Sequence, residues 1–211
     1  MGRKPLDKKR NSNDEKKHRW IKKSIQLFQL SGLNKVTMDE FAKRLDVSKA
    51  TIYNHFKSRE EIIEMAVTYK IGEIKKFKDF FMDTDLDYLE RYYKGIRYYT
   101  EQLSDVSHIL LKDIKNLYPE MWQNVQVFQG KSSEVLYDYY AEGKKKGYFK
   151  DINIDMLVIS DRWFFETVLH TNFLMEKNLD SEQAFDEYFR MKFKGLLTDS
   201  SIEKFPLAYT M

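Results

Sequence analysis

The sequence contains no cysteine, only three prolines and eight glycines, and no long run of apolar residues. Without cysteine, the protein has no disulfide framework, no thiolate zinc site and no cysteine-based catalysis. The first 19 residues lack the apolar core of a secretion signal, and no stretch approaches the roughly 18 apolar residues that a membrane span needs. We therefore expect a cytoplasmic protein with no membrane partner.

Apolar and aromatic residues are plentiful, at 42% and 15% of the 211 residues, so the chain can bury a sizeable core. Charged residues make up 33% and the mean hydropathy is −0.63, which requires an extensive solvated surface. These values indicate a globular protein. The length allows one large domain or a small domain attached to a larger one, and we favour the second.

Charge is distributed unevenly along the chain. Residues 1–60 contain 16 Lys and Arg against 7 Asp and Glu, a formal charge of +9, so the other 151 residues carry −6 within the total of +3. A basic head on an acidic body is typical of a protein that places one end on nucleic-acid phosphates. A solvated surface with a basic tail accounts for the charge equally well, so charge alone does not decide.

Apolar residues recur with helical spacing through long segments, and no run resembles a strand, so we expect an all-α protein. A first helix is predicted over residues 14–31, with Ile21, Ile25 and Phe28 on one face and Gly32 ending it in the left-handed conformation. Beyond residue 84 the pattern predicts five more helices, near residues 85–103, 105–116, 119–145, 154–177 and 181–198.

Two short helices separated by a tight turn are predicted between residues 37 and 56. The Thr-x-x-Glu pattern at Thr37 is a capping box that starts a helix, and Ser48 can cap the next helix, near 49–56. The buried side of the first is Met38, Phe41, Ala42 and Leu45. A second capping box at Ser58 starts a fourth helix that reaches about residue 81. This arrangement predicts a helix-turn-helix.

The second short helix presents a face that could enter a DNA major groove. If Ile52 and Phe56 point inward with Val47, then residues 50, 51, 53 and 54 point outward. Thr51 and Asn54 can reach base edges, and an Asn can pair with adenine. The other candidate contacts are a close approach at Ala50 and phosphate or backbone contacts at Thr37, Ser48, Lys49, Tyr53, His55 and Lys57. Taken singly, Tyr53, Asn54 or His55 is better explained as an ordinary surface residue.

Residues 25–63 resemble the DNA-binding domain of the TetR family of regulators. The resemblance rests on Phe28, Gly32, Thr37, Phe41-Ala42, Val47-Ser48, Tyr53-Asn54-His55-Phe56, Lys57 and Glu60-Glu61. In this family the equivalents of Thr37, Lys49, Thr51, Tyr53, His55 and Lys57 typically touch DNA. Ala50 stands where glycine is frequent in the family, and its methyl group should hardly limit how closely the helix approaches DNA.

The resemblance implies a three-helix DNA-binding domain in residues 1–60, with a basic N-terminal extension, joined by a fourth helix to a helical ligand-sensing and dimerisation domain in residues 61–211. Residues 143–157 are similar to the link that precedes the dimer-forming helix pair of the family. Two half-sites are also needed for useful specificity, which favours a homodimer. The residues that could bury against a second copy, or in the core of one chain, are Trp163, Thr167, His170, Leu174, Phe185, Tyr188, Phe189 and Phe193.

The resemblance also implies that a small-molecule effector enters the second domain. Aromatic and histidine side chains that could line its pocket are Tyr92, Tyr99, Trp122, Phe128, Trp163, Phe164, His170 and Phe173, although aromatic residues at helical spacing are more often core. His108 and His170 are the only histidines of this domain, and we expect no metal site. No catalytic motif appears, so we expect no enzymatic activity and no cofactor.

These observations predict a transcription regulator, a repressor, that binds a palindromic operator in duplex DNA as a homodimer and is released by the effector. The alternative is an architectural or occlusion-type DNA-binding protein whose second domain binds a protein partner. A helical ligand carrier with a vestigial head is a third class, against which the basic head and the intact recognition face argue. Salt-dependent binding to duplex DNA separates the third class, and ligand-induced release separates the first two.

Overall fold

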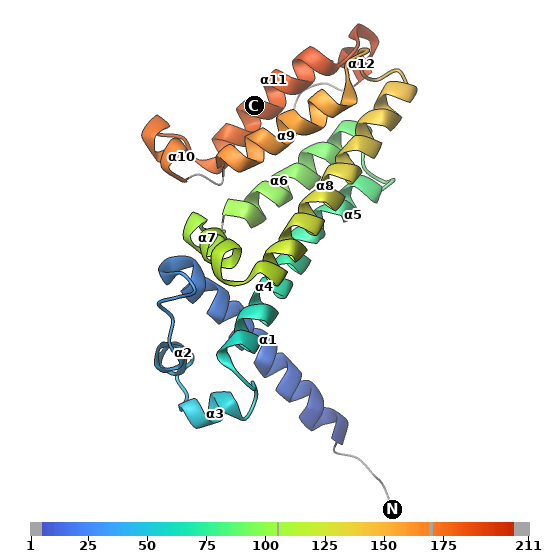
Figure 1. Ribbon diagram of the computed structural model, residues 1–211. Coiled ribbons are helices and arrows are strands. Elements are labelled where there is room, and N and C mark those ends of the chain that lie inside the picture. The colour runs from blue at the N-terminus through green and yellow to red at the C-terminus, as the bar shows by residue number, and fades with distance from the viewer. Residues whose placement is uncertain (1–5, 105, 169–170, 205–211) are drawn as a thin grey trace, which may run out of the picture. The chain divides into compact units, whose positions relative to one another are not determined.

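The computed structural model describes residues 6–104, 106–168 and 171–204, whose regular secondary structure is α-helix apart from one isolated bridge between Phe149 and Leu197 (Figure 1). The helices are α1 (Leu6–Ser31), α2 (Met38–Leu45), α3 (Lys49–Tyr53), α4 (Arg59–Lys75), α5 (Phe77–Met82), α6 (Tyr88–Ser104), α7 (His108–Leu117), α8 (Pro119–Lys145), α9 (Ile154–Val168), α10 (Thr171–Lys177), α11 (Ser181–Leu196) and α12 (Asp199–Lys204). The predicted all-α fold class is confirmed.

The chain folds as two compact units. The first comprises the described parts of residues 1–72 together with residues 109–122, and the second comprises those of residues 73–108 and 123–211. The first unit thus extends beyond the predicted domain of residues 1–60. It does so because Ile62 and Ile63 of α4, and Leu110 and Ile114 of α7, are buried in its core. Burial of each such side chain contributes about 1.5–3 kcal/mol, so these residues stabilise the first unit.

The core of the first unit forms where α1, α2 and α3 meet. Phe28 of α1 and Phe41 of α2 are almost completely buried and pack edge to face, with ring centroids 5.3 Å apart. Gly32 ends α1 with a φ of +77°, as its position in the sequence predicts. A side chain is strained in this conformation. The predicted buried residues Ile21, Ile25 and Phe28 all face this core.

Several helix boundaries differ from the predictions. α1 begins at Leu6, not near residue 14, and α3 ends at Tyr53, not near residue 56. The prediction of a single helix over residues 58–81 is wrong, because the helix is interrupted at Lys76, between α4 and α5. At the break the Lys76 amide donates to the Glu73 carbonyl in a three-residue turn, and the Tyr98 hydroxyl donates to the same carbonyl. The Glu73 carbonyl thus accepts a bond from Tyr98, which lies 25 residues along the chain. The periodicity of residues 58–81 gives no sign of such a distant partner.

The far end of the chain also differs from the prediction. The segment predicted as one helix over residues 154–177 is described as α9 and α10, with residues 169–170 outside the described ranges. α11 ends at Leu196 and is followed by the short helix α12, which the pattern did not predict. Within the described residues, no helix combines the length and the apolar character needed to cross a membrane.

The second unit is built around an aromatic core. Tyr88 of α6 stacks on Tyr139 of α8, with ring centroids 4.5 Å apart, and each hydroxyl donates to the other residue's carbonyl. Phe185, Phe189 and Phe193 of α11 are completely buried in the same core. They were predicted either to face a second copy or to lie in the core of one chain, and the structure assigns them to the core.

Candidate nucleic-acid interface

Capping residues fix the start of α2, its end, and the start of α3. The Thr37 hydroxyl accepts a hydrogen bond from the Glu40 amide at 3.3 Å, and the Thr37 amide donates to the Glu40 carboxylate at 2.7 Å. This is the predicted capping box. α2 then ends at Asp46, whose φ of 56° lies in the left-handed region that Asp tolerates better than most residues. Ser48 caps α3 by accepting from the Thr51 amide at 3.1 Å.

α3 buries one face and exposes the other. Ile52 is completely buried, and Phe56, just beyond the helix, is 2% exposed. On the opposite side Tyr53 is 51% exposed, and Ala50 and Asn54 are exposed as well. The inward and outward positions therefore follow the helical periodicity predicted from the sequence. What results is a short helix whose outer face consists of small and polar side chains.

Thr51 differs from its neighbours, because its side chain is only partly exposed. Its hydroxyl lies 2.8 Å from the Ser48 hydroxyl, within hydrogen-bonding distance. The two hydroxyls thus orient each other at the first turn of α3. A hydroxyl can donate one hydrogen bond and accept two, so this contact leaves capacity for a further partner.

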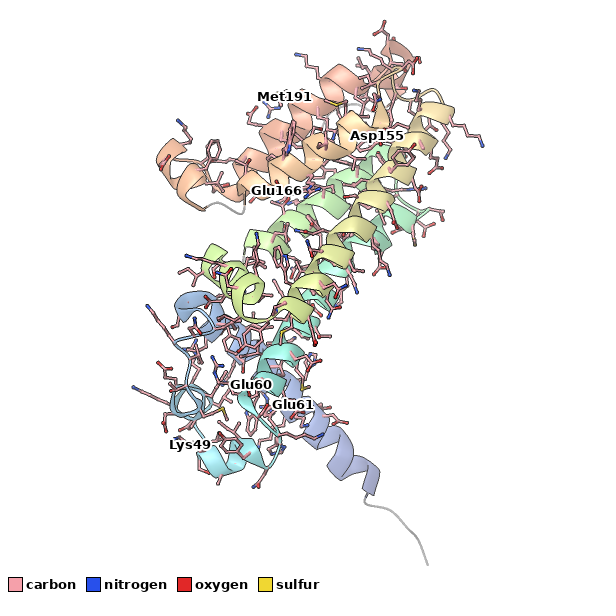
Figure 2. The ribbon with its side chains drawn as sticks, viewed as in Figure 1. Lys49, Glu60, Glu61, Asp155, Glu166 and Met191 are labelled. Carbon is pink, nitrogen blue, oxygen red and sulfur yellow. The ribbon has the colours of Figure 1, made fainter. Side chains whose placement is uncertain are left out.

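Two lysines flank the outer face. Lys49 is labelled in Figure 2. Its Nζ lies 2.7 Å from Asp39 Oδ1, but both side chains are largely exposed, at 49% and 75%, so the pair contributes at most about 1 kcal/mol. Lys57 is exposed at the other end, and its backbone amide donates to the Glu61 carboxylate. In the predicted capping box the Glu61 carboxylate would accept from the Ser58 amide, but it accepts from the Lys57 amide, one residue earlier. The other bond of the box is present, since the Glu61 amide donates to the Ser58 hydroxyl.

His55 packs inward toward α1. Its ring meets the edge of Trp20, with centroids 5.0 Å apart and planes at 87°, and its Nδ1 atom is buried with no hydrogen-bond partner among the described residues. Burial lowers the pKa of His55, and the nearby ammonium groups of Lys16 and Lys17 lower it further. His55 is therefore neutral near pH 7. Its contacts make it a packing residue between α3 and α1.

The loop that leads into α2 is held by side chains from distant parts of the sequence. Asp113 Oδ2 accepts hydrogen bonds from the amides of Leu33, at 2.7 Å, and Asn34, at 3.3 Å. Arg59 donates to the carbonyls of Leu33 and Val36 and, through a third bond of 3.2 Å, to the Tyr118 hydroxyl. These bonds fix where α2 begins. No local sequence signal pointed to Arg59, Asp113 or Tyr118, because their partners lie 23 to 80 residues away.

The aromatic residues predicted for an effector pocket are not brought together as one set. Trp122 lies in the first unit, packed against that unit's core. In the second unit Tyr92, Tyr99 and Phe128 are buried. Trp163 and Phe173 are exposed at 58% and 41%, Phe164 stacks on Tyr188 with centroids 4.2 Å apart, and His170 lies outside the described residues. The structure therefore assigns Trp122 to the first unit and leaves Trp163 and Phe173 exposed, and the effector pocket stays a prediction.

A buried ion pair stands at the centre of the second unit. Asp161 of α9 is completely buried, and its carboxylate lies 2.6 Å from the Lys192 ammonium of α11. Three tyrosine hydroxyls donate to the same carboxylate, from Tyr92 at 2.6 Å, Tyr140 at 2.5 Å and Tyr188 at 2.8 Å. Burial of the three phenols raises their pKa, and the negative charge of Asp161 raises it further. The cluster joins α6, α8, α9 and α11.

An exposed apolar strip lies on α9 and α11. Met156, Ile159 and Trp163 of α9 have the spacing of one helix face and are 58%, 37% and 58% exposed, and Met191 of α11 is 70% exposed. Figure 1 shows α9 and α11 side by side, and Figure 2 labels Met191 on α11. A strip of large apolar side chains at the surface of a folded unit is typical of a protein interface.

Comparisons with known proteins find similarity to bacterial transcriptional regulators. Residues 21–66 match the sequence profile of "Bacterial regulatory proteins, tetR family". The chain is 19% identical to YvaF of Bacillus subtilis, an uncharacterized HTH-type transcriptional regulator, over 88% of this chain and 97% of YvaF. It is 26% identical to IcaR of Staphylococcus aureus, the negative transcriptional regulator of the icaADBC biofilm operon, over 49% of this chain and 70% of IcaR.

Among solved structures, the chain is similar to PfmR, a transcriptional regulator of the same family from Thermus thermophilus. The TM-score is 0.66 at 20% identity, over 85% of this chain and 100% of PfmR. This similarity covers both helical units and shows that the two proteins share a fold.

Proposed function

Because this chain belongs to the TetR family of bacterial regulatory proteins, we propose that it is a repressor that binds a palindromic DNA operator as a homodimer. The observation that carries the proposal is the outer face of α3, where Ala50, Tyr53 and Asn54 are exposed on a basic head while Ile52 is fully buried. A helix that buries one side and presents small and polar residues on the other can enter a major groove about 12 Å wide.

Each exposed side chain has a defined task in this proposal. Asn54 and Thr51 contact base edges, and Ala50 lets the helix approach the bases closely. Tyr53, Lys49 and Lys57 bind phosphates, since a hydroxyl or ammonium group donates well to a phosphate oxygen but reads no base. The remaining candidates, Thr37 and Ser48, contribute through the helix starts that they cap. Their hydroxyls are already engaged in the caps.

The resemblance implied that His55 contacts DNA, but in this proposal it has a packing role. Its buried Nδ1 atom and its contact with Trp20 support a role in holding α3 against α1. In this proposal it positions Tyr53 and Asn54 for contact with DNA rather than binding a phosphate through that atom.

The exposed strip on α9 and α11 supports the homodimer. Met156, Ile159, Trp163 and Met191 are covered when the same strip of a second copy packs on them around a twofold axis. Two copies place two recognition helices on one operator, which gives the specificity that a single α3 of five residues lacks. A second copy is the occupant we propose for this strip.

We further propose that a small molecule bound in the second unit releases the repressor. Support comes from the family, and from buried aromatic side chains such as Tyr99 and Phe128, which could contact an apolar ligand. The alternative, an occlusion-type protein whose second unit binds a protein partner, uses the same α3 face. Addition of candidate small molecules to the protein–operator complex separates the two, because only the first predicts release.

The experiment that tests DNA binding is selection of bound fragments from the source genome, followed by anisotropy measurements on the recovered sequence. The proposal predicts a palindromic site bound at least a thousandfold more tightly than unrelated duplex, about 4 kcal/mol. Equal affinity for recovered and unrelated fragments would contradict a sequence-specific repressor and favour the architectural alternative.

A further inference from the structure

α1 extends well beyond the core that it helps to build. It begins at Leu6, whereas the family profile begins at residue 21 and the first buried residue of α1 in the described core is Trp20. Fourteen residues of α1 precede Trp20 and rise about 21 Å at 1.5 Å per residue, so the first turns of the helix extend beyond the core. Figure 1 shows these turns standing clear of α2, α3 and α4.

The turn of α1 just before Trp20 continues the helix face that packs on the core. At 100° per residue, Lys16 and Lys17 share an arc of about 140° with Trp20 and Ile21. The carboxylates Asp14 and Glu15 fall outside this arc. The face that packs on the core at Trp20 is thus basic at the edge of the core. We call Lys16 and Lys17 the α1 basic strip.

Both members of the strip are fixed beside the recognition helix. Lys16 Nζ lies 4.7 Å from the centre of the Trp20 ring, and Lys17 Nζ lies 5.3 Å from the centre of the Phe56 ring. Both ammonium groups are close enough to His55 to lower its pKa. A lysine that rests on an aromatic face has given up much of its side-chain freedom before any partner binds, which lowers the entropic cost of a further contact.

The acidic side chains that the structure describes do not pair with either ammonium group. Among the residues that the structure describes, no carboxylate oxygen lies within 4.0 Å of Lys16 Nζ or Lys17 Nζ, in contrast to Lys49 with Asp39. Two positive charges are therefore held at the end of α3 that also carries Tyr53 and Lys57. An extended polyanion that follows this edge of the head would neutralise them.

We infer that the α1 basic strip is a second contact surface for the DNA backbone, next to α3 but independent of the base sequence. This inference rests on the proposed function, since it requires that α3 place the head on duplex DNA. Lys16 and Lys17 rest on different aromatic rings, those of Trp20 and Phe56, so the strip presents two separate ammonium groups to the backbone. Its contribution is affinity that depends on salt and not on sequence.

The test compares the salt dependence of DNA binding by glutamine variants. Lys16→Gln/Lys17→Gln keeps most of each side-chain stem on its aromatic ring. The matched control is Lys131→Gln/Lys145→Gln, which removes the same charge from exposed positions of the second unit. Thermal melting checks that each variant folds, and fluorescence anisotropy gives affinity for a recovered operator and for unrelated duplex.

The inference predicts that the slope of log affinity against log salt falls by about one for each phosphate that a variant no longer binds, with affinity about tenfold weaker per phosphate at moderate salt. Operator and unrelated duplex should weaken by the same factor, while the control keeps the wild-type slope. A wild-type slope in the strip variant would overturn the inference and leave the proposed function standing. Failure of the wild-type protein to bind any duplex would overturn both.

Discussion

At the scale of single residues, Asn54 and Lys57 should separate base reading from phosphate binding. Asn54 is exposed on the outer face of α3, where its amide can pair with a base edge, whereas Lys57 is a charge at the rim. We predict that Asn54→Ala costs about 1–3 kcal/mol at particular base pairs. Lys57→Ala and Tyr53→Phe should weaken binding to all sequences about equally. Affinities for single-base operator variants measure the difference, and equal losses on every sequence for all three variants would refute the assignment.

The ion pair between Asp161 and Lys192 should dominate the stability of the second unit. Each group is buried, so removing one leaves the other charged and unpaired, which costs about 3–5 kcal/mol. We predict this loss for Asp161→Asn and for Lys192→Met, with partial recovery in the double variant. The control is Arg162→Met, which removes a pair with Glu166 at the surface and should cost less than about 1 kcal/mol. Urea unfolding measures each free energy, and equal costs for buried and surface variants would contradict this account.

His55 should make stability depend on pH. Its pKa in the folded protein lies below the ordinary value of 6.5, so between the two values the unfolded chain holds the proton more strongly. The free energy of unfolding should therefore fall as the pH drops through 6.5 toward the folded-state pKa. His55→Phe keeps a ring against Trp20 and removes the titration, so its stability should vary less over this range. Identical pH profiles for the two proteins would show that His55 is not responsible.

At the scale of elements, the glycine that ends α1 and a glycine inside α8 should respond differently to an added methyl group. A Cβ atom at Gly32 would lie 2.7 Å from Asp113 Oδ2 and 2.8 Å from Ile109 Cγ2, and φ is +77° there. We predict that Gly32→Ala destabilises the first unit by more than about 1 kcal/mol. Gly130, inside α8, has open space around the same position, so Gly130→Ala should stabilise the protein by about 0.5–1 kcal/mol. Thermal melting of both variants checks the two signs.

Local signals predicted the helix-turn-helix well, because its caps and its buried positions lie within a few residues of each other. The capping residues Thr37 and Ser48 and the buried Ile52 follow from spacing alone. The break near Lys76 and the holding of the α1–α2 loop by Asp113 could not be predicted in this way. They depend on hydrogen bonds between residues 25 to 80 positions apart, and nothing in a short window encodes such partners.

The aromatic residues of the second unit show a different limit. Helical spacing identified Phe185, Phe189 and Trp163 as apolar, but it could not tell a surface that meets a second copy from the core of one chain. The structure buries the two phenylalanines completely and leaves Trp163 58% exposed. The charged cluster escaped prediction altogether, since a single aspartate and a single lysine on amphipathic helices resemble ordinary surface residues.

At the scale of the whole molecule, assembly should depend on the exposed strip. Trp163→Glu/Met191→Glu places two charges where one copy is already solvated, so the fold should persist while the dimer dissociates. We predict a monomer by analytical ultracentrifugation at micromolar concentration, and operator affinity reduced at least about tenfold. The control Met82→Glu changes another methionine that is 73% exposed and should remain dimeric. A dimer in the double variant would place the interface elsewhere.

The most direct test of the central claim is an anisotropy titration of a recovered palindromic operator, with the wild-type protein and Asn54→Ala compared on that operator and on unrelated duplex. A repressor that reads DNA through α3 should prefer the operator at least a thousandfold, and the substitution should reduce this preference by about 1–3 kcal/mol while leaving binding to unrelated duplex unchanged. Equal binding to both duplexes by the wild-type protein, or an unchanged preference in Asn54→Ala, would contradict the account.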